Sequence, residues 1–365
     1  MNTIVARVPI VIPAYEPDDR LILLINQMID CPLGPIIICD DGSGEDYKTI
    51  FEQAKMLIEE QGGTVIHHDI NMGKGKALKT AFEYIINFYP NVIGCVTADS
   101  DGQHTAKCIL QVAEALMKNP DNLILGVRKF RGEDIPWKSK FGNSLTEKVF
   151  SYATGIHVSD TQTGLRGIPV LFMKQLLNVP GERFEFETQM LLESIEQWPI
   201  VEVSIETIYD SKENHQTHFN PILDSIKIYR VLGKRFIKYV FSSLSSSIID
   251  IVLFWLLCNM LKTRVGLYIA MATVLARIIS ATYNYLMNYK IVFHSQEKYS
   301  SSALKYIVLA ITQMTLSAVL VTTGTLLIPL FSEVIWKVLI DTVLFFISYH
   351  LQQNFVFHKF RKEKK

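Results

Sequence analysis

The sequence has no excess of charge of either sign and few cysteines. Lys and Arg together number 36, as do Asp and Glu, so the formal net charge is zero. This balance gives no support for a nucleic-acid partner. The five cysteines are scattered without a CxxC pair, which argues against zinc and redox motifs and indicates reduced core thiols in a reducing compartment.

The N-terminus lacks the features of a cleavable secretory signal. The apolar run at residues 8–12 is too short for the hydrophobic region of a signal, and Pro13 closes it. We therefore expect the first part of the chain to stay in the cytoplasm.

Charge is scarce in the later part of the chain. Four segments carry at most one formal charge each: 239–261, 265–289, 306–332 and 338–357. Each reaches the length of about 20 residues that crosses the hydrocarbon core of a bilayer. The sequence thus predicts an all-α domain with four transmembrane helices at 239–358, and a multi-pass protein of the cell membrane.

Basic residues flank the predicted spans on both sides. Five of them precede the first span: Lys227, Arg230, Lys234, Arg235 and Lys238. A basic tail, 359–365, follows the last span. Because cytoplasmic flanks are rich in Lys and Arg, we expect both termini and the first domain to be cytoplasmic. Residues 226–238 are expected to form an interfacial linker helix.

Residues 1–225 are expected to form an α/β domain. Short β-branched runs at 8–12, 36–40, 64–68, 92–98 and 122–127 alternate with amphipathic stretches at 18–29, 45–60, 74–88 and 105–118. Continuous apolar runs are typical of strands covered on both faces. Their alternation with helices predicts a doubly wound, mostly parallel sheet with its ligand site at the carboxyl ends of the strands.

Polar clusters follow these strands, and one contains two carboxylates. Asp99 and Asp101 lie two residues apart after a buried run, and Gln103 follows. Hard cations such as Mg²⁺ take one or two carboxylates together with substrate phosphates. An isolated pair of this kind is more often the acidic start of a helix. Its coincidence with the other polar strand ends favours a site for Mg²⁺ or Mn²⁺ at Asp99, Asp101 and Gln103.

Several motifs in order resemble glycosyltransferase family 2, which has the GT-A fold. They are PAYEP at 13–17, DDGS at 40–43, NMGKGKAL at 71–78, TADSDGQH at 97–104 and GVR at 126–128. The DSDGQH stretch is similar to the DxDxQH motif of dolichyl-phosphate mannose synthases and their bacterial polyprenyl-phosphate relatives. The resemblance continues through FGN at 141–143, DTQTGLR at 160–166 and FEFE at 184–187.

The resemblance implies roles for particular residues. The base and ribose of a nucleotide sugar would be held by Pro13, Ala14, Tyr15 and Glu16 with Asp40 or Asp41, and Lys74 would line the same pocket. Phosphate oxygens of the donor or the acceptor would meet Arg128 and Arg131. Gln162 and Glu187 would face the transferred sugar, and His218 or Lys212 would serve the acceptor phosphate. Asp99 would orient the acceptor or assist the metal.

The membrane part contains an internal repeat. A Lys-Tyr pair opens each half, at 238–239 and 305–306, and a Val-Phe-His stretch closes each, at 292–294 and 356–358. This pattern resembles the GtrA-like membrane family, which is proposed to help move glycosylated lipids across the bilayer. The repeat places Arg277 and Asp341 at equivalent positions, and we expect them to form an ion pair between the two hairpins because charges within a membrane are usually paired.

The leading functional hypothesis is a hexosyltransferase that moves a sugar from a nucleotide sugar to polyprenyl phosphate by a metal-dependent, inverting displacement. UDP-glucose is the first donor to consider and GDP-mannose the second, with undecaprenyl phosphate favoured over dolichyl phosphate. The absence of a QxxRW motif favours a single transfer over polysaccharide synthesis. Two alternatives stay open: a glycolipid transporter with a regulatory soluble domain, and an anchored transferase that acts on another acceptor.

Overall fold

The structure is a computed structural model, and it describes residues 8–29, 31–32, 34–128, 137–206, 223–261, 268–327 and 332–357. The chain divides into two compact units. The first comprises Met1–Phe150 and Ile156–Val231, and the second comprises Ser151–Gly155 and Leu232–Lys365.

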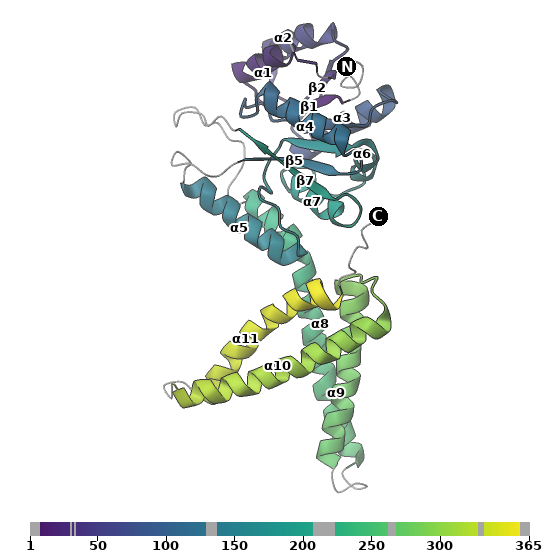
Figure 1. Cartoon of the computed structure of the whole chain (residues 1–365), viewed down its shortest axis with the longest axis vertical. Helices are drawn as coiled ribbons and strands as arrows, with labels where there is room; N and C mark the ends of the chain where they lie inside the picture. Colours follow the sequence, from purple (N-terminus) through teal and green to yellow (C-terminus); the bar gives the residue numbers. More distant parts are fainter. Residues whose placement is uncertain are drawn as a thin grey trace. The chain divides into compact units, whose positions relative to one another are not determined.

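The first unit is built on a seven-stranded sheet in the order β3-β2-β1-β4-β6-β5-β7. Strands β1, β2, β5 and β7 are labelled in Figure 1. The strands are β1 (Ile10–Ala14), β2 (Ile36–Asp40), β3 (Thr64–His67), β4 (Gly94–Thr97), β5 (Leu123–Arg128), β6 (Arg166–Pro169) and β7 (Ile200–Ile205). Only β6 runs antiparallel to its neighbours, β4 and β5. The five expected strands are all present, whereas β6 and β7 were not predicted.

Helices cover both faces of this sheet. On one face, α1 (Asp19–Ile29), α2 (Lys48–Glu59) and α4 (Ala106–Lys118) enclose the main hydrophobic core. On the other, α3 (Lys74–Phe88) packs on β1 and β2 and contacts α6 (Val170–Leu176) and α7 (Glu185–Gln197). A short 3₁₀ turn, η2 (Glu45–Tyr47), precedes α2, and α5 (Trp137–Thr154) follows β5. The predicted doubly wound, mostly parallel sheet of the GT-A type is confirmed.

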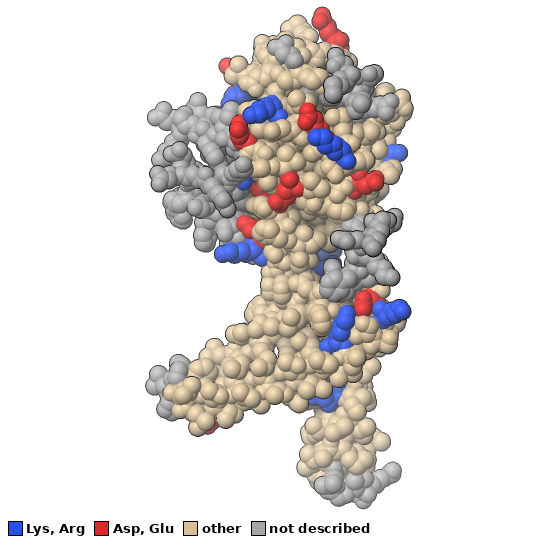
Figure 2. All heavy atoms as spheres, in the orientation of Figure 1, with Lys and Arg blue, Asp and Glu red and all other residues tan. Residues whose placement is uncertain are grey.

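The second unit is helical and apolar. It contains most of α8 (Leu223–Leu261), together with α9 (Tyr268–Met287), α10 (Tyr299–Leu327) and α11 (Glu333–Leu351). The structure has four helices long and apolar enough to cross a membrane, with mean hydropathies between 1.2 and 1.9. The visible surface of α9 and α10 is almost entirely free of charged side chains (Figure 2). The expectation of four apolar helices is therefore confirmed.

The predicted linker at 226–238 is not a separate helix. Residues 223–261 form one continuous α-helix, which contains both the predicted linker and the first span. The segment contains no proline, and Gly233 is its only glycine. Because a single glycine costs a helix about 1 kcal/mol, the sequence offers nothing strong enough to end the helix between the two segments.

The repeat in the membrane unit is visible in its hydrogen bonds. Each half ends in a π-helical turn, η3 (Asn288–Val292) and η4 (Gln352–Val356). The equivalent residues Asn288 and Gln352 meet directly, with Nδ2 of the first donating to Oε1 of the second over 3.0 Å. Tyr239, Tyr285 and Tyr349 belong to the buried aromatic cluster around this contact. The two hairpins are therefore joined at their π-helical ends.

The predicted ion pair between the hairpins is wrong. Arg277 Nη2 lies 3.1 Å from Asp250 Oδ2 in the same hairpin. Asp341 instead pairs with Lys337 one helical turn earlier, at 2.8 Å, and accepts a hydrogen bond from Ser317. Each charge has a partner within its own hairpin, which lowers the cost of burial in a membrane before the hairpins associate.

Candidate functional site

Polar side chains converge at the carboxyl ends of the central strands. Asp40 is the last residue of β2, Asp99 follows β4 after Ala98, and Arg128 is the last residue of β5. Since β1, β2 and β4 are parallel neighbours and β5 runs in the same direction across β6, the loops that follow them share one rim. This rim is where ligands bind in open α/β sheets.

Lys74 joins two carboxylates at this rim. Its Nζ lies 2.7 Å from Asp99 Oδ1 and 3.0 Å from Glu187 Oε1. Lys74 is the first residue of α3, and Gly73 before it has a φ of 102°, a conformation that favours glycine. Glu187 lies in the first turn of α7. Three elements that are distant in the sequence therefore build one charged cluster.

The charges in this cluster shift one another's protonation. Burial lowers the pKa of the Lys74 ammonium, but the adjacent Asp99 and Glu187 carboxylates outweigh burial and raise it overall. Burial likewise raises the pKa of Asp99, yet Lys74 and His104 hold it well below its usual range. Asp99 is thus a carboxylate and Lys74 an ammonium at neutral pH.

Asp101 behaves differently from Asp99. Burial and the nearby negative charge of Asp99 raise its pKa. Its Oδ1 accepts a hydrogen bond of 3.0 Å from the backbone N–H of Gln103. A carboxylate crowded by another carboxylate is suited to a cation, which removes the repulsion.

The donor set at Asp101 is compatible with a hard divalent cation that also takes ligands from a substrate. The described residues contain no group of three or more His, Cys, Asp or Glu side chains placed to hold a metal alone. Mg²⁺ commonly uses one or two protein carboxylates and completes its shell with phosphate oxygens and water. The predicted ligands Asp101, Gln103 and Asp99 each carry side-chain oxygen atoms of this kind.

A glycine makes room for Asp99. A Cβ atom at Gly164 would lie 2.5 Å from Asp99 Oδ1 and closer still to Oδ2. Contacts shorter than 3.0 Å are essentially never made by real Cβ atoms. Because Gly164 has no side chain, the Asp99 carboxylate can lie against the backbone that leads into β6. The sequence did not reveal this role.

A buried arginine ties the same loop to α7. Arg166 is 1% exposed and donates to the carbonyl oxygens of Thr163 at 2.9 Å and Glu187 at 2.7 Å. These bonds fix the loop that carries Gly164 against the helix that carries Glu187. The DTQTGLR motif thus acts in part by positioning other residues of the site.

The predicted nucleotide-pocket residues lie at the ends of β1 and β2. Pro13 and Ala14 are buried in β1, and the backbone N–H of Glu16, whose φ is 49°, donates to Ser43 Oγ. Tyr15 follows β1 directly and is partly buried.

The two aspartates at the carboxyl end of β2 already have protein partners. Asp40 accepts from Ser43 N–H and contacts His67 Nδ1 at 2.8 Å. Asp41 accepts from the backbone N–H groups of Met72 and Gly73 and contacts the buried His68. Asp41 therefore organises the loop that delivers Lys74.

Arg128 is held in a forked pair. Its Nε and Nη2 donate to the two carboxylate oxygens of buried Asp160, at 2.6 and 3.0 Å. The pairing fixes the plane of the guanidinium and occupies its Nε–Nη2 edge. Gln162, two residues after Asp160, is exposed. Arg131, Lys212 and His218 lie outside the described residues.

Comparison with known proteins places both parts of the chain in families. Residues 10–172 match the family Glycosyl transferase family 2, and residues 238–357 match GtrA/DPMS, transmembrane domain. The first unit is thus a sugar-transferring catalytic domain. The chain thus combines a Glycosyl transferase family 2 domain with a GtrA/DPMS transmembrane domain, and it is a membrane protein.

The chain is similar to two archaeal proteins. The chain is 26% identical over 219 residues to UDP-N-acetylglucosamine--dolichyl-phosphate N-acetylglucosaminyltransferase of Methanococcus voltae, a match that covers 55% of this chain and 85% of that protein. It is 25% identical over 229 residues to Glycosyltransferase AglJ of Haloferax volcanii, covering 62% and 71%. Among solved structures, the mannosyltransferase PcManGT from Pyrobaculum calidifontis, in complex with GDP-Man and Mn²⁺, aligns with a TM-score of 0.41 at 12% identity over 97% of this chain and 88% of that one.

Proposed function

We propose that the protein transfers a hexose from a nucleotide sugar to the phosphate of a polyprenyl lipid, giving a polyprenyl-phosphate monosaccharide. The observation that carries the proposal is the Lys74–Asp99–Glu187 cluster beside Asp101, in a chain that also has four membrane-spanning helices. The name of the Methanococcus voltae relative includes dolichyl phosphate, which supports a lipid phosphate as acceptor here.

Different residues of the rim bind the nucleotide and the metal. Pro13, Ala14, Tyr15 and Glu16, with Asp40 or Asp41, hold the base and ribose. Asp101, Gln103 and Asp99 would hold Mg²⁺ or Mn²⁺, which would supply positive charge near the departing nucleoside diphosphate. A unit charge about 4 Å away contributes on the order of 4 kcal/mol at an effective dielectric of 20. That stabilisation amounts to about three decades of rate.

The acceptor needs alignment more than deprotonation. A phosphate monoester has its second pKa near about 6 and is already anionic at neutral pH. Asp99, whose pKa is held below its usual range by Lys74 and His104 despite burial, is a poor general base. We assign it to positioning Lys74, in addition to its place among the metal ligands. Arg128 aligns a phosphate for an in-line, inverting displacement.

The choice of nucleotide sugar and the orientation of the protein in the membrane rest on other observations. UDP-glucose and GDP-mannose are the donors to test first, and the name of the Methanococcus voltae relative adds UDP-N-acetylglucosamine. The basic residues in the first part of α8 and after α11 support a cytoplasmic position for the catalytic domain and both termini. The acceptor would then be met at the cytoplasmic leaflet.

The test is sugar transfer by the purified full-length protein. Each radiolabelled donor is incubated with undecaprenyl phosphate and Mg²⁺, and label is counted in organic-extractable lipid. We expect label with one donor, and we expect EDTA or Asp101→Asn to abolish it. Folded protein that gives no lipid label with any nucleotide sugar would refute the proposed reaction.

A further inference from the structure

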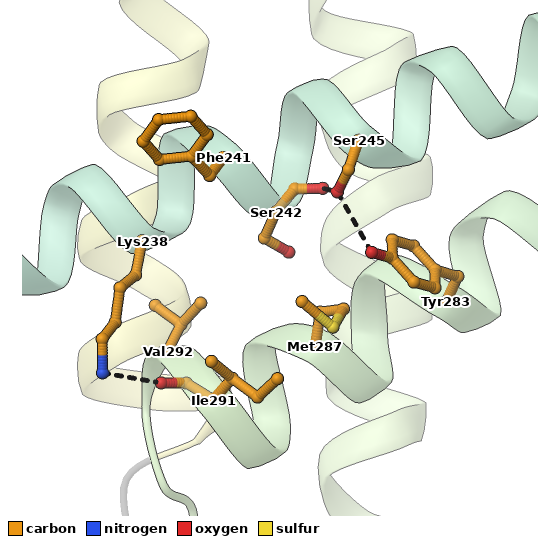
Figure 3. A pocket seen from close by; sticks show the side chains of 8 residues that line it. All are labelled: Lys238, Phe241, Ser242, Ser245, Tyr283, Met287, Ile291 and Val292. Atoms are coloured by element: carbon orange, nitrogen blue, oxygen red, sulfur yellow. Dashed lines mark hydrogen bonds between the residues drawn. The ribbon is translucent and has the colours of Figure 1, made fainter.

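A groove opens between α8 and α9 in the membrane unit (Figure 3). It has a volume of about 340 Å³, at the lower end of the range of roughly 300–1,000 Å³ that small-molecule sites occupy. Phe241 of α8, Met287 of α9 and Val292 of η3 form apolar walls. The groove lies within two of the four membrane-spanning helices.

One cationic side chain, that of Lys238, lies at one end of this groove. Lys238 is the last charged residue before an uncharged stretch that continues to Asp250. Its Nζ makes one long contact, 3.5 Å to the carbonyl oxygen of Ile291 across the groove (Figure 3). Because Lys227, Arg230, Lys234 and Arg235 precede it, Lys238 lies where the helix passes from its basic end into its apolar part. That position is the level of lipid headgroups.

One hydroxyl inside the groove lacks a partner. Ser245 and Ser247 donate to carbonyls of their own helix, and Ser246 donates to Ser280 O. Ser242 Oγ, by contrast, is buried and has no hydrogen-bond partner among the described residues. It points into the groove between the two helices (Figure 3). A buried hydroxyl without a partner is costly in an apolar medium, and an oxygen of a bound ligand would satisfy it.

We propose that this groove binds the phosphate end of a polyprenyl phosphate. The Lys238 ammonium pairs with the phosphate, the Ser242 hydroxyl donates to a phosphate oxygen, and the first isoprene units lie along Phe241, Met287 and Val292. The identity of the lipid rests on the proposed function, whereas the groove, the cation and the hydroxyl do not.

Charge and shape select this lipid over a membrane phospholipid. A phosphate monoester carries about −1.5 to −2 charges at neutral pH, whereas the phosphodiester of a phospholipid carries one. Its volume of about 340 Å³ leaves little room for a second chain beside the first. The stronger charge gives the larger gain from pairing with Lys238.

The test is photolabelling of the full-length protein in detergent micelles, with a polyprenyl phosphate that carries a benzophenone next to its phosphate. We expect label on peptides containing Ser242 or Met287. Excess undecaprenyl phosphate should compete. Undecaprenol, phosphatidylglycerol and inorganic phosphate should not, which separates the lipid phosphate from a chain, a phospholipid headgroup and a free anion.

Matched variants isolate the cation and the hydroxyl. Lys238→Gln should reduce labelling about tenfold, while Lys234→Gln, an exposed lysine one turn earlier on α8, should stay within twofold of wild type. Ser242→Leu fills the groove and should also lose label. If that variant fails to fold, the contrast between the two lysine variants decides the question.

The outcomes separate this site from the proposed reaction. Asp101→Asn should lose sugar transfer and keep normal labelling. Label elsewhere in the chain, equal labelling of both lysine variants, or competition by phosphatidylglycerol would overturn the groove site even if transfer is observed. Labelling at the groove without transfer from any donor would support the site and refute the reaction.

Discussion

Substitution of Gly164 by alanine tests whether the position of the Asp99 carboxylate sets the rate. The added Cβ would lie 2.5 Å from Asp99 Oδ1 and closer to Oδ2, where at least 3.0 Å is required. The φ of Gly164 is not in the left-handed region, so alanine strains no backbone there. The clash falls on the carboxylate, which must retreat from its place beside Lys74.

The size of the effect follows from that retreat. Relief of the contact needs a shift of about 1 Å, and a misplacement of that size in a catalytic constellation costs about 100-fold in rate. A 100-fold loss corresponds to about 2.7 kcal/mol. The Lys74–Asp99 separation of 2.7 Å would lengthen beyond hydrogen-bonding distance, so we expect kcat/KM to fall about 100-fold.

The assay is steady-state sugar transfer to undecaprenyl phosphate, with thermal unfolding of the same preparations as a measure of folding. Gly44→Ala is the matched control, because a Cβ at Gly44 meets nothing within 4 Å and its φ of −62° suits alanine. We expect the control to retain wild-type activity. A folded Gly164→Ala protein with kcat/KM within threefold of wild type would show that the placement of Asp99 does not limit the reaction.

Three further predictions concern ion pairs. Asp160→Asn should lower kcat/KM about tenfold to 100-fold, because Arg128 loses a charge-assisted fork; unchanged steady-state kinetics would contradict this. Lys74→Met removes the cation between the Asp99 and Glu187 carboxylates. Two like charges about 5.5 Å apart repel each other by about 3 kcal/mol at an effective dielectric of 20, so transfer should fall by more than 100-fold in the same assay. In the membrane unit, Arg277→Asp and Asp250→Arg should each lower the thermal stability of the purified protein, and the double swap should recover it if they pair as observed.

The fold was largely readable from the sequence where local patterns decide it. The five buried runs and the helices between them lie where periodicity placed them, because continuous apolar runs and amphipathic stretches are local properties. The four apolar spans followed from length alone. In contrast, β6 is a four-residue Arg-Gly-Ile-Pro stretch that pairs with strands far away in the sequence, and no local pattern marks it.

The site was predicted in its residue types and less well in its contacts. Asp99, Asp101, Lys74 and Glu187 were all candidates, yet nothing in their spacing indicated that Lys74 bridges two carboxylates. The bond between Arg128 and Asp160, and the space that Gly164 leaves, were equally hidden. The residue roles themselves stay predictions until they are tested by mutation.

The sequence by itself determined the two-part organisation of the chain, the family motifs at the strand ends and the positions of the apolar helices, because each depends on residues close together in the chain. The tertiary structure alone decided the partners of the charged groups. Arg277 pairs with Asp250 and not with Asp341, since an ion pair depends on which helices lie side by side. Electrostatic energy falls with distance in space, and separation along the chain does not determine that distance.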